Sequence, residues 1–198
     1  KNIIVAYSEV EIKCKISYDG GNNFGAPITI AADAGNQCAP SLVQADNGNV
    51  VCVYHSDEDG AGDTNYEIKC AYSTDNGATW TSTVDVINTA VKINSYVIKD
   101  IDGALYASGT DQANDKIYLS NSTDNGLTWD AGSPIELITD TTNGPRNNGL
   151  CLTSDGTIIC VYHGDVSNDI HQVRRGMWEA YSANGCPCAI DRLKQKLI

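Results

Sequence analysis

The stretch STDNGATW, from Ser73 to Trp80, decides the fold, because it recurs along the chain. It returns as STDNGLTW, from Ser122 to Trp129, and more loosely as SYDGGNNF, from Ser17 to Phe24. All three copies fit the pattern Ser-x-Asp-x-Gly-x-x-Trp/Phe. The residues that define it are Ser17, Asp19, Gly21 and Phe24 in the first copy, Ser73, Asp75, Gly77 and Trp80 in the second, and Ser122, Asp124, Gly126 and Trp129 in the third.

Each residue type in this pattern has a mechanical role in a tight turn between two strands. The Asp carboxylate can accept hydrogen bonds from backbone N–H groups just downstream, and the Gly takes a positive φ that a Cβ would oppose. The large apolar face of the aromatic residue then packs beside neighbouring strands and fixes the turn against the sheet. The three copies therefore predict three equivalent turns.

The rest of the repeat unit returns with the same spacing. The aspartates Asp19, Asp75 and Asp124 are 56 and 49 positions apart. The segments DNGNVVCVYHSD, from Asp46, and SDGTIICVYHGD, from Ser154, align at about twice that distance. A period of about 50 residues is typical of stacked β-sheet repeats such as propeller blades.

The pattern resembles the Asp-box, or BNR repeat, of sialidases and related β-propellers. In that family the box joins the third and fourth strands of a blade, on the side away from the ligand pocket. The resemblance covers roughly residues 3–185. It implies an all-β fold of propeller blades, each made of four antiparallel strands.

Written out along the chain, the unit predicts a propeller segment over residues 1–188 with two full and two incomplete blades. The approximate blade boundaries are 1–33, 34–90, 91–141 and 142–188. The first blade lacks its first strand, and AYSANG (Ala180 to Gly185) is interpreted as a decayed box. Period-two alternation in the third strands predicts one row of buried side chains: Ile12, Cys14 and Ile16, then Ile68, Cys70 and Tyr72, then Ile117 and Leu119.

The length of the chain leaves two alternatives for closure. Propellers typically close with about four to eight blades, so 198 residues fall short of a full sialidase ring. Either the chain is a segment of a larger protein, or it forms a small or open propeller; the exposed edge of the first blade favours the segment.

Residues 189–198, AIDRLKQKLI, predict a short C-terminal helix, either packed or beginning a coiled-coil stalk.

Composition narrows the partners. Acidic residues number 25 against 13 basic ones, which gives a net charge of −12, and an acidic body argues against nucleic acid. No apolar stretch predicts membrane insertion.

The chain has eight cysteines. Cys14 and Cys70 repeat with the blade, as do Cys52 and Cys160, which favours a role as small apolar side chains in a core. Cys186 and Cys188 are too close to pair comfortably, so they could form bridges elsewhere, including to other subunits.

Candidate ligand-binding residues lie in the loops that share the face opposite the boxes. Sialidases clamp the substrate carboxylate with three arginines and use a Tyr nucleophile assisted by a Glu, with an Asp acid/base. The resemblance places Arg146 where a clamp member would lie, at a blade entrance whose counterpart in the earlier blade is Cys38. No Arg motif precedes the first box and no Tyr/Glu pair is assigned, so this stretch alone does not make a working sialidase.

Three further sets of residues are candidates with alternative interpretations. His55 and His163 occupy equivalent strand ends, where repetition favours a structural hydrogen bond over ligand binding. Trp178 lies outside any box and either packs in a blade or stacks on a sugar ring. Asp57, Asp59 and Asp63 lie in a Gly-rich loop and could hold Ca²⁺, although a solvated acidic loop has the same composition. No other cofactor is expected.

These features favour a glycan-facing, non-catalytic propeller module of an extracellular, cell-surface or virion appendage protein, with carbohydrate as its partner. One alternative is a segment of an exo-acting, sialidase-like glycoside hydrolase whose remaining active site lies outside this chain. The other is a structural spacer that the cysteines or the tail join to other subunits.

Overall fold

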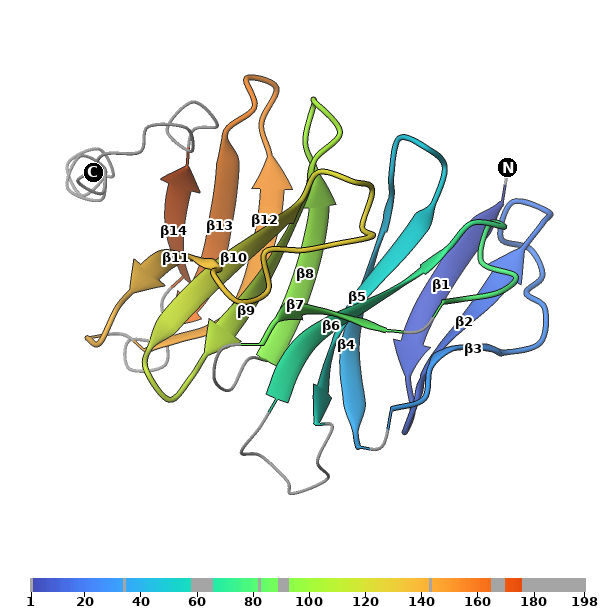
Figure 1. Ribbon diagram of the computed structural model, residues 1–198, viewed down its shortest axis with the longest axis horizontal. Coiled ribbons are helices and arrows are strands. Elements are labelled where there is room, and N and C mark those ends of the chain that lie inside the picture. Colours follow the sequence, from blue (N-terminus) through green and yellow to red (C-terminus); the bar gives the residue numbers. More distant parts are fainter. Residues whose placement is uncertain are drawn as a thin grey trace.

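The computed structural model describes residues 2–33, 35–57, 66–81, 83–88, 93–142, 144–164 and 170–175. These residues form fourteen strands in four antiparallel sheets, and there is no helix among them (Figure 1). Accordingly, nothing in the described part of the chain is a helix that could cross a membrane. The predicted helix at 189–198 lies outside the described residues.

We call the four sheets blades 1 to 4, in chain order. Blade 1 contains β1 (Ile3–Ser8), β2 (Ile12–Ser17) and β3 (Ile28–Ala31). Blade 2 contains β4 (Gln37–Gln44), β5 (Val50–Asp57), β6 (Tyr66–Ser73) and β7 (Val84–Ile87). Blade 3 contains β8 (Ile93–Lys99), β9 (Leu105–Asp111), β10 (Lys116–Ser122) and β11 (Ile135–Thr139). Blade 4 contains β12 (Pro145–Leu152), β13 (Ile158–Gly164) and β14 (Ile170–Arg175).

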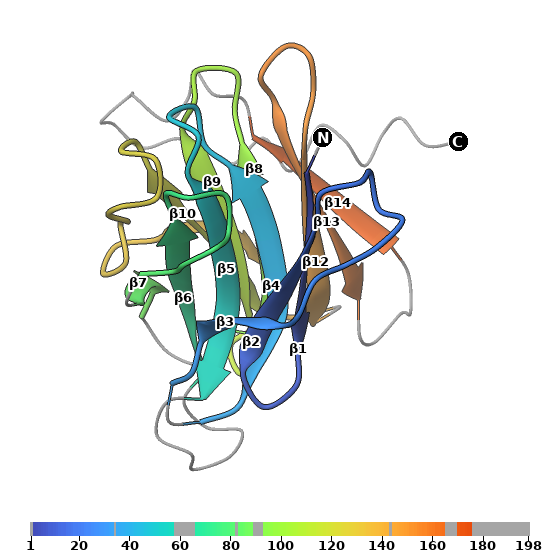
Figure 2. The same cartoon turned by 90° about the vertical axis from the view of Figure 1, so that its right-hand side faces the viewer.

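The predicted fold class, a partial β-propeller, is confirmed. Strands follow one another across each sheet in chain order, so each blade is an antiparallel meander. The two middle blades have four strands and the two outer ones have three in the described chain. The first strands β4, β8 and β12 contact one another in turn and form the inner rim of the array (Figures 1 and 2).

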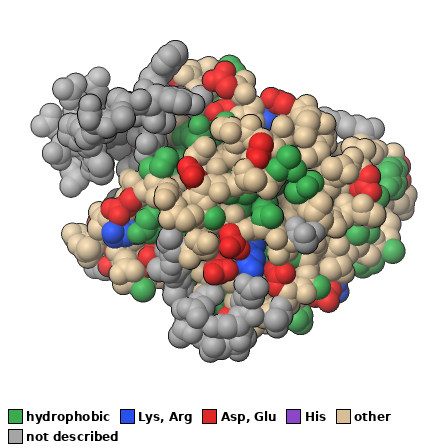
Figure 3. Space-filling view, viewed as in Figure 1, with side chains coloured by type: hydrophobic (Ala, Val, Ile, Leu, Met, Phe, Trp, Pro, Cys, Tyr) green, Lys and Arg blue, Asp and Glu red, His purple; other side chains and the backbone are tan. Residues whose placement is uncertain are grey.

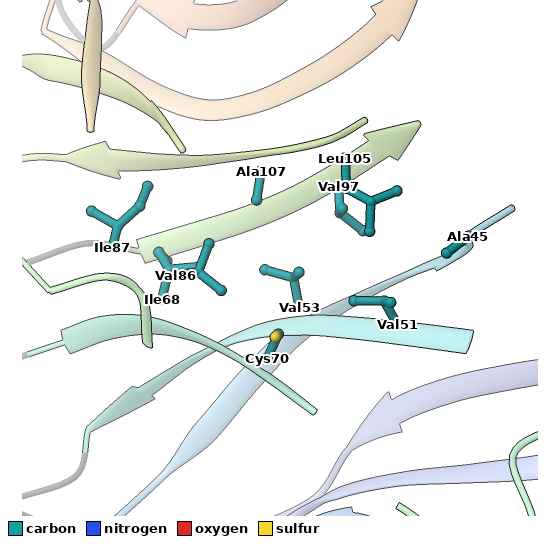
Figure 4. Close-up of a cluster of buried hydrophobic side chains, with 10 residues drawn as sticks. All are labelled: Ala45, Val51, Val53, Ile68, Cys70, Val86, Ile87, Val97, Leu105 and Ala107. Carbon is teal, nitrogen blue, oxygen red and sulfur yellow. The ribbon is translucent and has the colours of Figure 1, made fainter. Parts of the chain in front are cut away.

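The core lies between successive blades rather than inside any one sheet. Figure 4 shows the cluster between blades 2 and 3, where Val53 and Cys70 of blade 2 lie close to Val97 and Ala107 of blade 3. Equivalent clusters fill the interfaces between blades 1 and 2 and between blades 3 and 4. Each blade therefore depends on its neighbour to bury its apolar row.

The alternation predicted for the third strands is confirmed with one exception. Ile12, Cys14, Ile68, Cys70, Ile117 and Leu119 are fully buried, and Ile16 nearly so, whereas Tyr72 is only partly buried. The repeated cysteines Cys14, Cys52, Cys70 and Cys160 are likewise buried and carry free thiols. Cys186 and Cys188 lie outside the described residues.

The three repeated turns, residues 17–24, 73–80 and 122–129, have the predicted geometry. In the second, the Thr79 N–H donates to Asp75 Oδ1 at 2.8 Å, and the Gly77 N–H donates to Ser73 Oγ, also at 2.8 Å. Gly77 has a φ of +90°. The same bonds recur in the other two turns. Side-chain acceptors thus satisfy backbone donors that the turn leaves unpaired.

The turns of blades 2 and 3 also contact the preceding blade. The Trp129 indole Nε1–H of blade 3 donates to Cys70 Sγ of blade 2 at 3.1 Å, and Trp80 of blade 2 packs in the cluster shared with blade 1. Phe24 differs from the prediction, because 41% of it is exposed. The reason is its position: no sheet of the described chain covers the outer side of blade 1.

Candidate functional site

The first residues of the inner strands, the last residues of the second strands and the first residues of the third strands share one end of the array, the lower end in Figure 1. The repeated turns and the loops that leave the inner strands lie at the other end. In the described part of the lower end, an arginine, several carboxylates and a set of amide and hydroxyl groups come together. Figure 3 shows acidic side chains scattered over the face that is seen in Figure 1, with fewer basic ones.

A β-bulge near the start of each inner strand positions the side chains at this end. The register shifts between Cys38 and Ser41, between Ile93 and Tyr96, and between Arg146 and Asn148. Each bulge contains one residue with positive φ: Ala39, Asn94 and Asn147. Bulges re-aim side chains at sheet ends, and here they set Cys38, Ile93 and Arg146 in equivalent positions.

Arg146 links blade 4 to blade 3. Its Nη1 lies 3.5 Å from Asp115 Oδ1, on the loop between β9 and β10. The same nitrogen donates to the Pro145 carbonyl at 3.0 Å. The Arg146 side chain remains 23% exposed. The guanidinium is therefore held in place by a neighbouring carboxylate and still reaches solvent.

A tyrosine–aspartate pair lies beside this ion pair. The Asp140 N–H donates to the Asp115 carbonyl at 3.0 Å, and the Tyr162 hydroxyl donates to Asp140 Oδ2 at 3.1 Å. Burial, with the Asp140 carboxylate second, raises the pKa of Tyr162. Tyr54 makes the same bond to Asp33 Oδ2 at 2.8 Å in blade 2. Sequence reasoning missed these pairs, although both tyrosines belong to the repeated VYH segment and both aspartates precede an inner strand.

Amide and hydroxyl groups connect the inner strands around the same end. The Asn148 Nδ2 group donates to the Asn94 carbonyl at 2.9 Å and to Thr110 Oγ1 at 2.8 Å, and Ser108 Oγ donates to Asn148 Oδ1. The Ser95 hydroxyl donates to the Ala39 carbonyl of the preceding blade at 2.7 Å. These bonds hold the inner strands of blades 2, 3 and 4 in one rigid row.

His55 and His163 are less alike than repetition suggested. The His55 ring packs edge-on against Tyr66, with centroids 5.3 Å apart. Burial lowers its pKa to about 4, so it is neutral at physiological pH. Its Nδ1 has no hydrogen-bond partner among the described residues, so this atom does not make the expected bond closing the strand. His163 is half-buried and sits opposite Arg146 in the β12–β13 register.

The remaining candidates are only partly described. Asp57 ends β5 and is buried, whereas Asp59, Asp63 and Trp178 lie outside the described residues. Within the described ranges no three His, Cys, Asp or Glu side chains gather as a metal-binding group. Calcium binding by the 57–63 loop stays a prediction.

No family model matches the chain, and no curated protein matches it. Solved structures do. A protein of unknown function from Dyadobacter fermentans DSM 18053 superposes with a TM-score of 0.63 at 16% identity, over 85% of this chain and 56% of that one. The NanB sialidase from Streptococcus pneumoniae gives a TM-score of 0.62 at 17% identity, over 90% and 29% respectively. A GH43 β-1,3-galactosidase gives 0.64 at 13% identity, over 88% and 40%.

These likenesses concern the fold. The chain is similar to β-propeller proteins that include a sialidase and a galactosidase, at sequence identities below 20%. It spans 56% or less of the length of each. What those proteins act on enters below only as support for a proposal.

Proposed function

We propose that this chain is a glycan-facing, non-catalytic propeller module whose ligand end is the one that carries Arg146. The observation that supports this most is the partly exposed Arg146–Asp115 pair, set by a bulge beside a rigid row of amide and hydroxyl groups. Convergent, pre-organised polar groups of this kind can hydrogen-bond the hydroxyls of a sugar. The fold-level likeness to glycan-active enzymes adds support by analogy only.

Two of the described tyrosines at this end are placed to support a binding site. Tyr54 and Tyr162 are buried and donate to aspartates, and both have a raised pKa. In this proposal their hydroxyls orient the loop carboxylates beside the ligand.

Binding of the full 198-residue chain to a glycan array tests the proposal. We expect retention of a glycan subset, and we expect Arg146→Ala to weaken binding about tenfold or more, because a charge-assisted hydrogen bond is lost. Lys99→Ala is the matched control, because Lys99 pairs with Asp46 at the opposite end. Equal loss in both variants would contradict the site.

The same assay separates the alternatives. Turnover of a fluorogenic sialoside would favour the hydrolase alternative. A blank array together with a defined oligomer in solution would favour the structural spacer. Asp115→Asn adds a further distinction, since a ligand carboxylate must compete with Asp115 for the guanidinium and should bind more tightly to this variant.

Two finer assignments belong to the same proposal. The three repeated turns are Asp-boxes, as their hydrogen bonds and their position between third and fourth strands support. The protein acts outside the cell, at its surface or on a virion, where glycans are displayed. Secretion assays would test this location.

A further inference from the structure

The first strand of blade 1 occupies the second position of a four-stranded blade. In β1, Ile3 pairs with Ser17, just as Val50 of β5 pairs with Ser73 and Leu105 of β9 pairs with Ser122. On their inner sides β5 pairs with β4 and β9 pairs with β8. Within the described chain no strand pairs with β1 on that side.

The direction of the backbone groups along β1 follows from one hydrogen bond. The Gly25 N–H donates to the Ile16 carbonyl at 2.9 Å, so this carbonyl points away from β1. Ile4 faces Ile16 in the register. In an antiparallel ladder the groups of such a facing pair both point outward, and direction alternates along the strand. The N–H and C=O groups of Ile4, Ala6 and Ser8 therefore point to the free edge.

A groove lies along this edge. It has a volume of about 550 Å³ and lies at the start of β1, between Ile4 of β1 and Leu42 of β4, which supply apolar walls, with Asn76 at the turn. Figure 2 shows blade 1 at the front, with β1 beside β4. The groove thus combines unpaired strand backbone on one wall with an apolar strand on the other.

The other blade interfaces show what fits such a groove. Val43 of β4 packs in the cluster that contains Val97 of β8, and Ile98 of β8 packs in the cluster that contains Leu150 of β12. Leu42 of β4 is equivalent to Val97 of β8 and Leu150 of β12. In the register, each of the three pairs with the same position of the second strand of its blade. Val97 and Leu150 thus each receive an apolar side chain from the first strand of the preceding blade. In the described chain blade 1 has no such strand, so no equivalent side chain faces Leu42.

We propose that the free edge of β1 and this groove bind an additional β-strand. The strand runs antiparallel to β1, lies next to β4, and inserts an apolar side chain against Leu42. Its occupant is an extended peptide with the sequence character of β4 and β8. Main-chain hydrogen bonds supply affinity in this mode of recognition, and the side-chain pocket supplies selectivity.

The probe is the eight-residue peptide of residues 93–100, INSYVIKD, labelled and titrated into the full 198-residue chain. We expect saturable binding that weakens about tenfold or more when the peptide carries Ile98→Lys, because the inserted side chain becomes charged. In the chain, Ala6→Pro should weaken binding by a similar factor. Proline removes an edge N–H that β2 does not use, so the β1–β2 ladder is retained. Ala6→Ser, which keeps the N–H, is the matched control.

Circular dichroism and the unfolding temperature establish whether Ala6→Pro is folded. If Ala6→Pro is unfolded, Leu42→Lys replaces it as the test. This variant puts a charge on the opposite wall of the groove and leaves β1 unchanged, so it should weaken peptide binding. The proposal is overturned if the wild-type chain shows no saturable binding, or if binding is equal in the folded variant and its control. It is also overturned if the chain dimerises through β1 and excludes the peptide, since a second copy is then the occupant.

Discussion

At the scale of single residues, the repeated turns work because a serine hydroxyl and an aspartate carboxylate accept the hydrogen bonds of backbone donors in the turn. Asp75 accepts hydrogen bonds from Ser73 and from both the backbone and the side chain of Thr79, and it does so while almost entirely in solvent. Hydrogen bonds to the charged form favour ionisation. They lower the pKa of Asp75 from 3.8 to about 2.

The first prediction follows from this pKa. Since the folded pKa lies below the unfolded one, the contribution of Asp75 to stability is fully present above about pH 4 and is lost as the pH falls through about 2. The hydrogen bond from the Thr79 hydroxyl lowers this pKa most, so Thr79→Val, which removes that bond, should raise the pKa of Asp75 toward 3.8. Carbon-detected NMR titration measures it, and Asp19, whose pKa of about 2 depends on Asn23, is the internal control. A wild-type Asp75 that titrates near 3.8 would contradict the geometry.

The glycine of the turn supports a second prediction. Gly126 has a φ of +87°, and a Cβ there would lie 2.7 Å from Val51 Cγ2 of the preceding blade. Gly48 has a similar φ of +91° but open space around it. We expect Gly48→Ala to cost about 1–2 kcal/mol from backbone strain alone, and Gly126→Ala to cost about 1–3 kcal/mol more from overpacking. Urea unfolding of both variants compares them. Equal costs would mean that the turn does not contact blade 2.

At the scale of elements, the strands were predictable where the sequence repeats and less so where it does not. The turns and the buried rows follow from local pattern, so Ile68 and Cys70 were correctly placed. The surroundings of Arg146 were not predictable, because Asp115 comes from a loop of the preceding blade and blade stacking brings the two together. Phe24 was misjudged for the same reason, since its environment depends on a neighbouring sheet rather than on its turn.

Strand burial gives a third prediction, on the thiols. Burial raises the pKa of Cys70 and of Cys160 to about 12 and raises those of Cys14 and Cys52, whereas Cys151 on the inner strand β12 is exposed. The thiolate is the reactive form. Iodoacetamide at pH 8, followed by peptide mass mapping, should therefore label Cys151 in the folded chain and the four buried cysteines only after denaturant is added. Rapid native labelling of Cys70 would show that the strands do not stack as described.

At the scale of the whole molecule, the array is a stack of blades whose two outermost faces are unlike its interior. Ile3 and Val5 on blade 1 are 38% and 46% exposed, although Cys52, the counterpart of Val5 in blade 2, is fully buried against its neighbour. Val161 of blade 4 is 37% exposed. Successive blades bury each other's apolar rows, which is the behaviour of a repeat protein in which stability comes from neighbour interfaces.

The account depends most on this radial stacking, in which the turn of one blade touches the strand of the blade before it. A NOESY spectrum of the labelled chain tests it at the indole Nε1–H of Trp129. We predict a cross-peak from this proton to the Hβ protons of Cys70, because the indole nitrogen lies 3.1 Å from the Cys70 sulfur. Cross-peaks from the indole proton only to residues of its own blade would contradict the stacked arrangement.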